Sequence, residues 1–150
     1  MSIRFAHTNI VSRDWKKLSA FYVQVFDCTP SSPTHLEGDW LTQATGVQEA
    51  RIKGQHLKLP GFDKNGPTLE IFQYAANEKR FADPRANREG FSHIAFQVDD
   101  VPDMEARVLS AGGSRIGEIA TKEYGKGSLT FTYVADPEGN IIELMKWTPK

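Results

Sequence analysis

Cysteine is almost absent from this sequence: Cys28 is the only one in 150 residues. A single thiol cannot form an internal disulfide, and it cannot supply the paired thiolates of a zinc ribbon or a redox motif. Long hydrophobic runs are also missing, since no segment approaches the roughly 20 apolar residues of a membrane span. The N-terminal segment MSIRFAHTNIVSRD carries charges where a signal peptide needs an apolar core. We therefore expect a cytoplasmic protein without a membrane partner.

Neither sign of charge dominates the chain. It contains 18 Lys and Arg residues against 19 Asp and Glu residues, for a formal net charge of −1, and the two signs are interspersed. A nucleic-acid-binding domain needs an extended basic surface, which this pattern does not provide. With 39% hydrophobic and 25% charged residues, the composition is that of one soluble globular domain.

The predicted elements follow the same order in both halves of the chain. Strands are expected where β-branched and aromatic residues cluster, and helices where apolar residues recur at helical spacing. The first half predicts strands at residues 3–11, 49–61 and 67–74, a helix at 14–26, and a loop with short extended pieces at 29–47. The second half predicts strands at 91–98, 114–119, 128–136 and 140–147, and a helix at 101–112. Asp136 to Asn140, DPEGN, is expected to form a tight turn.

A histidine precedes each predicted helix at the same distance. His7 lies seven residues before Asp14, His93 lies seven residues before Asp100, and both aspartates are expected to cap their helices. The repetition predicts two βαβββ modules within a single domain. The modules and their polar connector are expected at about residues 1–75, 91–150 and 76–90.

Four polar side chains fall at the centres of predicted strands: His7, Glu70, His93 and Glu143. Side chains alternate between the faces of a strand, and this alternation places both glutamates beside large apolar residues. A carboxylate in such surroundings is costly to bury unless a cation compensates it. A divalent ion bound by two imidazole nitrogens and two carboxylate oxygens would neutralise both charges and leave room for water or substrate. The alternative, ordinary core histidines and solvated glutamates, does not account for the matched positions in the two halves.

Four segments resemble the signature segments of the vicinal-oxygen-chelate superfamily: HTNIV with the helix that ends FYVQVF, LEIFQY, FSHIAFQVDD and YVADPEGNIIELMKW. This superfamily includes glyoxalase I, methylmalonyl-CoA epimerase, extradiol dioxygenases and fosfomycin- or bleomycin-resistance proteins. The resemblance spans nearly the whole chain and implies an α+β fold, in which paired βαβββ modules form a curved, open eight-stranded sheet around a metal. It places the metal ligands at His7, Glu70, His93 and Glu143, which match in type the ligands of bacterial glyoxalase I.

The resemblance implies a metal-dependent lyase or isomerase that moves a proton next to a metal-bound carbonyl of a small substrate. Nickel, cobalt, manganese and zinc all suit the donor set. The base is expected to be Glu143 or Glu70, or else Glu49, because TGVQEARI resembles the stretch of methylmalonyl-CoA epimerase that carries an acid/base glutamate. A second carboxylate, at Glu70, argues against an extradiol dioxygenase. The alternative function is a binding protein of the bleomycin-resistance type that sequesters an antibiotic or another small molecule.

Substrate contacts are expected along the same strands. Arg51 and Lys53 share a strand face and would bind a carboxylate or phosphate of the substrate. An apolar cavity wall is expected from the aromatic residues Phe5, Phe72, Tyr74, Phe91 and Trp147. His35 and His56 lie outside the matched positions and are expected to be surface or packing residues. The resemblance also implies a homodimer, which would protect exposed sheet edges.

Overall fold

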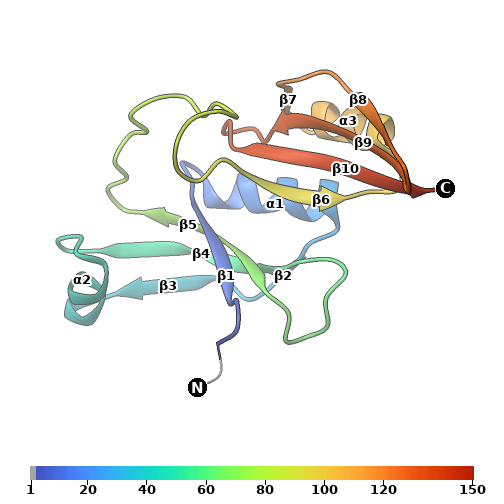
Figure 1. The fold of residues 1–150 in the computed structure, drawn as a ribbon. Coiled ribbons are helices and arrows are strands. Elements are labelled where there is room, and N and C mark those ends of the chain that lie inside the picture. The colour runs from blue at the N-terminus through green and yellow to red at the C-terminus, as the bar shows by residue number, and fades with distance from the viewer. Residues whose placement is uncertain (1–2) are drawn as a thin grey trace. The chain divides into compact units, whose positions relative to one another are not determined.

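The computed structural model describes residues 3–150, and it divides into two compact units with the boundary between Lys79 and Arg80 (Figure 1). This boundary lies inside the expected connector at residues 76–90. Each unit has its own five-stranded sheet. No helix among residues 3–150 is long and apolar enough to cross a membrane.

The first unit forms its sheet from strands that are far apart in sequence. Its elements are β1 (His7–Val11), α1 (Trp15–Phe26), β2 (Thr29–Pro30), β3 (Thr34–Glu37), α2 (Asp39–Thr45), β4 (Arg51–Lys58) and β5 (Thr68–Tyr74). The strand order is β1-β5-β4-β2, and β3 also pairs with β4. β1 runs parallel to β5, whereas β4 runs antiparallel to it. Helix α1 packs on β4 and β5.

The second unit repeats this topology. Its elements are β6 (His93–Gln97), α3 (Val101–Ser110), β7 (Ser114–Arg115), β8 (Ala120–Tyr124), β9 (Gly127–Ala135) and β10 (Ile141–Pro149). The strand order is β6-β10-β9-β7, with β8 on β9. β6 is parallel to β10, as β1 is to β5, and β9 is antiparallel to β10, as β4 is to β5. The predicted α+β class and the paired βαβββ modules are therefore confirmed.

Both principal helices begin at the predicted caps. The Asp14 carboxylate accepts a hydrogen bond from the Lys17 backbone at 3.2 Å, and the Asp100 carboxylate accepts one from Asp103 at 2.8 Å. Each helix then buries one apolar face against its own sheet. The fully buried side chains include Leu18, Tyr22, Leu69 and Ile71 in the first unit and Val108, Val134, Ile142 and Leu144 in the second. Each such aliphatic side chain contributes about 1.5–3 kcal/mol through removal from water.

The structure departs from the sequence prediction between residues 38 and 51. Helix α2 occupies part of the expected loop, where Gly38 and Gly46 flank it with φ angles of 108° and 71°. Leu41 fixes this short helix by packing with Ala50 and Ile52. Glu49 lies in a turn with φ of 50°, so the predicted strand at 49–61 begins two residues later, at Arg51. In the second unit, β8 was not predicted.

The DPEGN segment forms the predicted tight turn between β9 and β10. The buried carboxylate of Asp136 accepts hydrogen bonds from the backbone of Glu138 at 2.8 Å and of Asn140 at 3.0 Å. Gly139 takes a φ of 85°, which favours glycine. The turn fixes the register in which Glu143 of β10 lies opposite Tyr133 of β9.

Cys28 is buried just after α1, with 2% of its surface exposed. Burial, and to a smaller extent the negative charge of Asp27, raises the pKa of the Cys28 thiol from 9.0 to about 11. The thiol is therefore protonated at neutral pH.

Candidate functional site

In the first unit, one face of the sheet is covered by α1, and Glu70 lies on the other. The cross-strand pair of Leu57 and Leu69 is buried on the helix side. The adjacent cross-strand pair of His56 and Glu70 therefore lies on the opposite face. The predicted orientation of Glu70, away from the helix, is confirmed.

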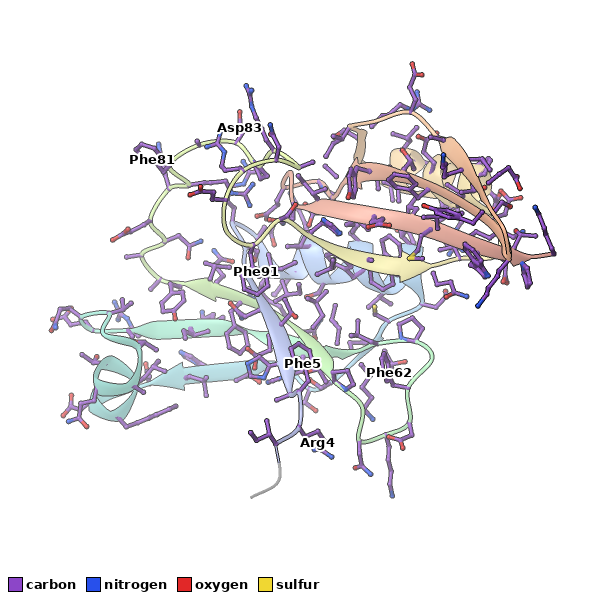
Figure 2. The ribbon with its side chains drawn as sticks, viewed as in Figure 1. Arg4, Phe5, Phe62, Phe81, Asp83 and Phe91 are labelled. Atoms are coloured by element: carbon purple, nitrogen blue, oxygen red, sulfur yellow. The ribbon has the colours of Figure 1, made fainter. Side chains whose placement is uncertain are left out.

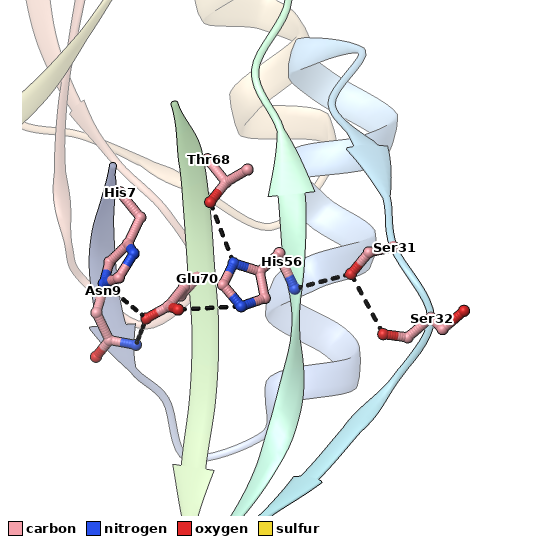
Figure 3. A network of polar contacts seen from close by, with 7 residues as sticks. All are labelled: His7, Asn9, Ser31, Ser32, His56, Thr68 and Glu70. Atoms are coloured by element: carbon pink, nitrogen blue, oxygen red, sulfur yellow. Dashed lines mark hydrogen bonds and ion pairs between the residues drawn. The ribbon is translucent and has the colours of Figure 1, made fainter. Parts of the chain in front are cut away.

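Glu70 is the centre of a polar network in this unit (Figure 3). Its Oε2 atom lies 3.3 Å from Nε2 of His7 and accepts a hydrogen bond from the Asn9 side chain, also at 3.3 Å. Its Oε1 atom lies 3.1 Å from Nε2 of His56. Both carboxylate oxygens thus have partners, which compensates the burial of a residue that is only 7% exposed.

His56, which the sequence predicts to be a surface or packing residue, also makes polar contacts in this network. Its Nε2 atom faces Glu70, and its Nδ1 atom lies 3.1 Å from the hydroxyl oxygen of Thr68. The antiparallel register of β4 and β5 is the signal that would identify His56 as a neighbour of Glu70. The loop at residues 59–67 separates these strands and obscures that register in the sequence.

The second unit contains a simpler pair. Nε2 of His93 lies 3.0 Å from Oε2 of Glu143, and their side chains are 28% and 16% exposed. The ring of Tyr133 lies beside the histidine, with the two ring centroids 5.0 Å apart. Tyr133 also stands directly opposite Glu143 across the strand pair. Sequence reasoning did not identify Tyr133.

In each unit, the separation within the pair fits two neighbouring ligands of a metal ion. Two donor atoms that each lie about 2.1 Å from a metal, at an angle of about 90–110°, are about 3.0–3.4 Å apart. The His7–Glu70 and His93–Glu143 separations of 3.3 and 3.0 Å fall in this range. Each unit therefore places one imidazole nitrogen and one carboxylate oxygen side by side. Within residues 3–150, no group of three or more His, Cys, Asp or Glu side chains is arranged so that it could hold a metal ion.

The other predicted residues lie elsewhere in the first unit. Arg51 precedes His56 by five residues in β4, which corresponds to about 16 Å along a strand. Arg51 and Lys53 are separated from Leu57 by even numbers of residues in β4. They therefore share its face, the α1 face of the sheet, which is opposite to that of His56. Arg51, Lys53 and Tyr74 line a pocket of about 410 Å³ together with His35, Glu37, Gln73 and Ala75. Glu49 is an exposed residue in the turn that precedes the first residue of β4, Arg51.

The aromatic residues expected in a cavity wall are also distributed. Phe72 lies beside His56, with 5.9 Å between ring centroids, and it packs against the cluster of Leu41, Ala50 and Ile52. Phe5 and Phe91 precede β1 and β6, and they are 66% and 96% exposed (Figure 2). Of the aromatic residues predicted to line a cavity, Phe72 is therefore the one that lies beside the Glu70 network.

Comparison with known proteins identifies relatives of this fold. The sequence profile of the Glyoxalase/Bleomycin resistance protein/Dioxygenase superfamily matches residues 4–144. A glyoxalase family protein from Bacillus cereus has a TM-score of 0.76 and 18% identity, over 97% of this chain and 93% of that chain. The fosfomycin resistance protein FosX from Listeria monocytogenes, in complex with Mn(II) and sulfate, has a TM-score of 0.56 and 17% identity, over 99% and 95% of the chains.

FosX from Mesorhizobium loti has a TM-score of 0.52 and 18% identity, over 96% and 91% of the chains. Comparison with curated proteins gives no significant match. At these identities the solved structures establish the fold, and the sequence profile, which covers most of the chain, establishes the family. The chain belongs to the Glyoxalase/Bleomycin resistance protein/Dioxygenase superfamily.

Proposed function

We propose that this protein is a divalent-metal-dependent lyase or isomerase of the glyoxalase or epimerase type, which moves a proton next to a carbonyl of a small substrate. The observation that carries the proposal is the pair of ligand-like contacts, His7 with Glu70 and His93 with Glu143. These four side chains would hold one nickel, cobalt, manganese or zinc ion. The Mn(II) in the Listeria FosX complex supports a divalent ion. When bound, the ion polarises the substrate carbonyl and makes the adjacent C–H bond more acidic.

Glu143 is the better placed of the two paired glutamates to act as the base. Both oxygens of Glu70 are held, by His7, Asn9 and His56. Among residues 3–150, Glu143 has a single partner, His93 at Oε2, so its Oε1 atom can accept a proton. A general base must turn a free lone pair toward the hydrogen that it removes. In this proposal Glu143 removes the proton at Oε1 and returns it, while Glu70 stays in place.

Glu49 remains a predicted base that requires its own test. It lies beyond the start of β4, about 16 Å or more along the strand from His56, and it cannot share a substrate carbon with Glu70. An exchange to glutamine deletes its base and preserves its size. Unchanged turnover in that variant would eliminate Glu49.

Metal content is the first test of the proposal. Protein stripped with a chelator and reconstituted with each of the four metals should take up about one ion per chain. The His7→Ala and His93→Ala variants should lose this ion. His35→Ala should keep it, because His35 lies on another strand and contacts the exposed Glu37. A wild-type protein that binds no stoichiometric metal but binds small molecules tightly would instead be a sequestering protein.

Solvent exchange is the second test. Glutathione hemithioacetals and acyl-CoA thioesters should be incubated with the metal-loaded protein in deuterated water. A proton transfer next to the carbonyl should introduce deuterium at that carbon or into the product. Absence of exchange and of turnover across these carbonyl compounds would contradict the proposed reaction class.

A further inference from the structure

We propose that His56 is a positioning residue, which orients the Glu70 carboxylate for metal binding through a chain of polar contacts that begins at Thr68. The inference rests on the proposed function, because it concerns the same site, and it adds a residue that the ligand set does not include. The chain runs from the Thr68 hydroxyl to Nδ1 of His56 and from Nε2 of His56 to Oε1 of Glu70, with 3.1 Å at each step (Figure 3).

The strand register explains why one imidazole reaches both groups. Thr68 and Glu70 are two residues apart in β5 and share a face, and His56 of β4 lies directly opposite Glu70. The imidazole bridges the two β5 side chains with its two nitrogens. The Phe72 ring packs against it in a T-shaped arrangement, with an interplanar angle of 89°. The ring is therefore contacted at both nitrogens and by Phe72.

The backbone of His56 is also fixed. Its N–H donates to the Ser31 hydroxyl at 3.2 Å, and its carbonyl accepts from the Ser31 N–H at 2.8 Å. These two bonds tie the middle of β4 to the segment between β2 and β3. A side chain that is held at its backbone and at both ring nitrogens has little rotational freedom left, and it can define the orientation of its neighbour.

The donor and acceptor groups around the neutral His56 ring are compatible with one tautomer. The Glu70 carboxylate only accepts hydrogen bonds, so Nε2 of His56 must carry the hydrogen. Nδ1 is then an acceptor, and the Thr68 hydroxyl is its donor. Glu70 thus selects the tautomer with the hydrogen on Nε2, and the Thr68 hydroxyl fits it by donating to Nδ1.

The contact divides the two oxygens of Glu70 between two tasks. Oε1 faces His56, whereas Oε2, which also accepts from Asn9, lies beside His7 and would ligate the ion with its second lone pair. Glu70 would accordingly bind through one oxygen. Partners of this kind, which hold a ligand without touching the metal, change metal affinity by about 10- to 100-fold when they are removed.

The test is a titration of metal-free full-length protein with Co(II) and with Mn(II), in competition with a chelating dye. His56→Ala should weaken binding by about 10- to 100-fold. His56→Gln keeps a side-chain N–H donor and should recover most of this loss, and Thr68→Val should show an intermediate loss. His35→Ala is the matched control, a strand histidine of the same unit outside the network, and should bind like wild type.

Two further measurements separate positioning from a general loss of structure. The visible spectrum of bound Co(II) should change in His56→Ala, where Glu70 is free to bind through both oxygens, and should be preserved in His56→Gln. Thermal melts of the metal-free variants report whether each one is folded. In metal-free wild type, nitrogen-15 NMR should show His56 with its hydrogen on Nε2.

The proposal is overturned if folded His56→Ala binds Co(II) as tightly as wild type. It is also overturned if that variant loses as much affinity as His7→Ala, because His56 would then be a ligand itself, or if the NMR spectrum places the hydrogen on Nδ1. Wild-type protein that binds neither metal would remove the proposed function as well. Each failure therefore has its own signature.

Discussion

Tyr133 occupies the position in β9 that His56 occupies in β4. Each stands directly opposite the paired glutamate of the neighbouring strand, Glu143 or Glu70. His56 contacts its glutamate through a ring nitrogen, whereas the Tyr133 ring packs against His93. The two modules therefore retain the same histidine and glutamate positions and differ in what surrounds them.

The same register identifies two more differences around the glutamates. Asn9 lies opposite Glu70, but Ala95 lies opposite Glu143; Thr68 lies opposite His7, but Ile141 lies opposite His93. Asn9 and Thr68 thus have apolar counterparts, Ala95 and Ile141, in the second unit. This contrast supports separate tasks for the two glutamates.

The first prediction follows from this separation of tasks. Glu143→Gln should lower kcat by about 10²- to 10⁴-fold, because it removes the general base, while an amide oxygen remains to ligate the ion. Glu70→Gln should instead weaken metal affinity and lose activity mainly when metal is limiting. Turnover at saturating metal and metal titrations of both variants would check this. Full activity in Glu143→Gln would assign the base elsewhere.

Gly54 is predicted to be intolerant of a side chain. A Cβ atom there would meet the carbonyl oxygen of Ile71 and, at 2.7 Å, the ring of Phe72. Gly54→Ala should therefore destabilise the fold by about 1–3 kcal/mol and should displace Phe72 from the His56 ring. The matched control is Gly125→Ala, where nothing lies within 4 Å of the added atom. Urea denaturation would measure both, and equal stabilities would contradict the prediction.

The ion pair of Glu105 and Arg115 predicts an acid-dependent contribution to stability. Arg115 donates to both oxygens of the buried Glu105 carboxylate, at 2.9 and 2.7 Å. Hydrogen bonds from Arg115 lower the pKa of Glu105 below 4.5, although burial opposes them. As the pH falls, the unfolded chain therefore takes up this proton before the folded chain does. The stabilisation is complete above pH 4.5 and is lost as the pH falls through the lowered pKa.

Arg115→Met should accordingly lower Tm at neutral pH, and the difference from wild type should shrink as Glu105 becomes protonated. Thermal melts over a series of pH values would follow this change. Lys122→Met, which alters an exposed lysine of β8, serves as the control for charge alone. A difference that stays constant at low pH would show that the ion pair is not its cause.

A homodimer is the fourth prediction. β1 and β6 are the end strands of their respective sheets, and each pairs with one neighbour in its own unit. An unpaired strand edge favours association, and closed twofold dimers are the commonest assemblies of soluble chains. Light scattering should give a mass of about twice 16.8 kDa. A mass of one chain at every concentration would contradict the prediction.

The sequence was sufficient to predict the repeated topology because the signals for it are local. Helix caps, the DPEGN turn and the alternation around Glu70 each depend on a few neighbouring residues. Helix α2 was not predictable, because seven residues carry too little periodicity and its position depends on the packing of Leu41 against Ile52. β8, with the sequence ATKEY, is exposed throughout and has no apolar alternation.

The position of His56 depended on information that is not local. A slip of one residue in the pairing of β4 with β5 would move His56 to the α1 face and Arg51 to the face of Glu70. The loop at residues 59–67 sets that register through its length and conformation. Alternation alone indicated that Arg51 and Lys53 share a face, but it could not indicate which face.

The burial of Cys28 makes this protein suitable for site-specific labelling. Thiol reagents attack the thiolate, and with a pKa of about 11 only roughly one molecule in 10⁴ carries it at neutral pH. A cysteine introduced at an exposed position would thus react in preference to the native thiol. Glu78 in the first unit and Lys122 in the second are exposed. Two spin labels, or a donor and an acceptor fluorophore, at these positions would report the distance between the units.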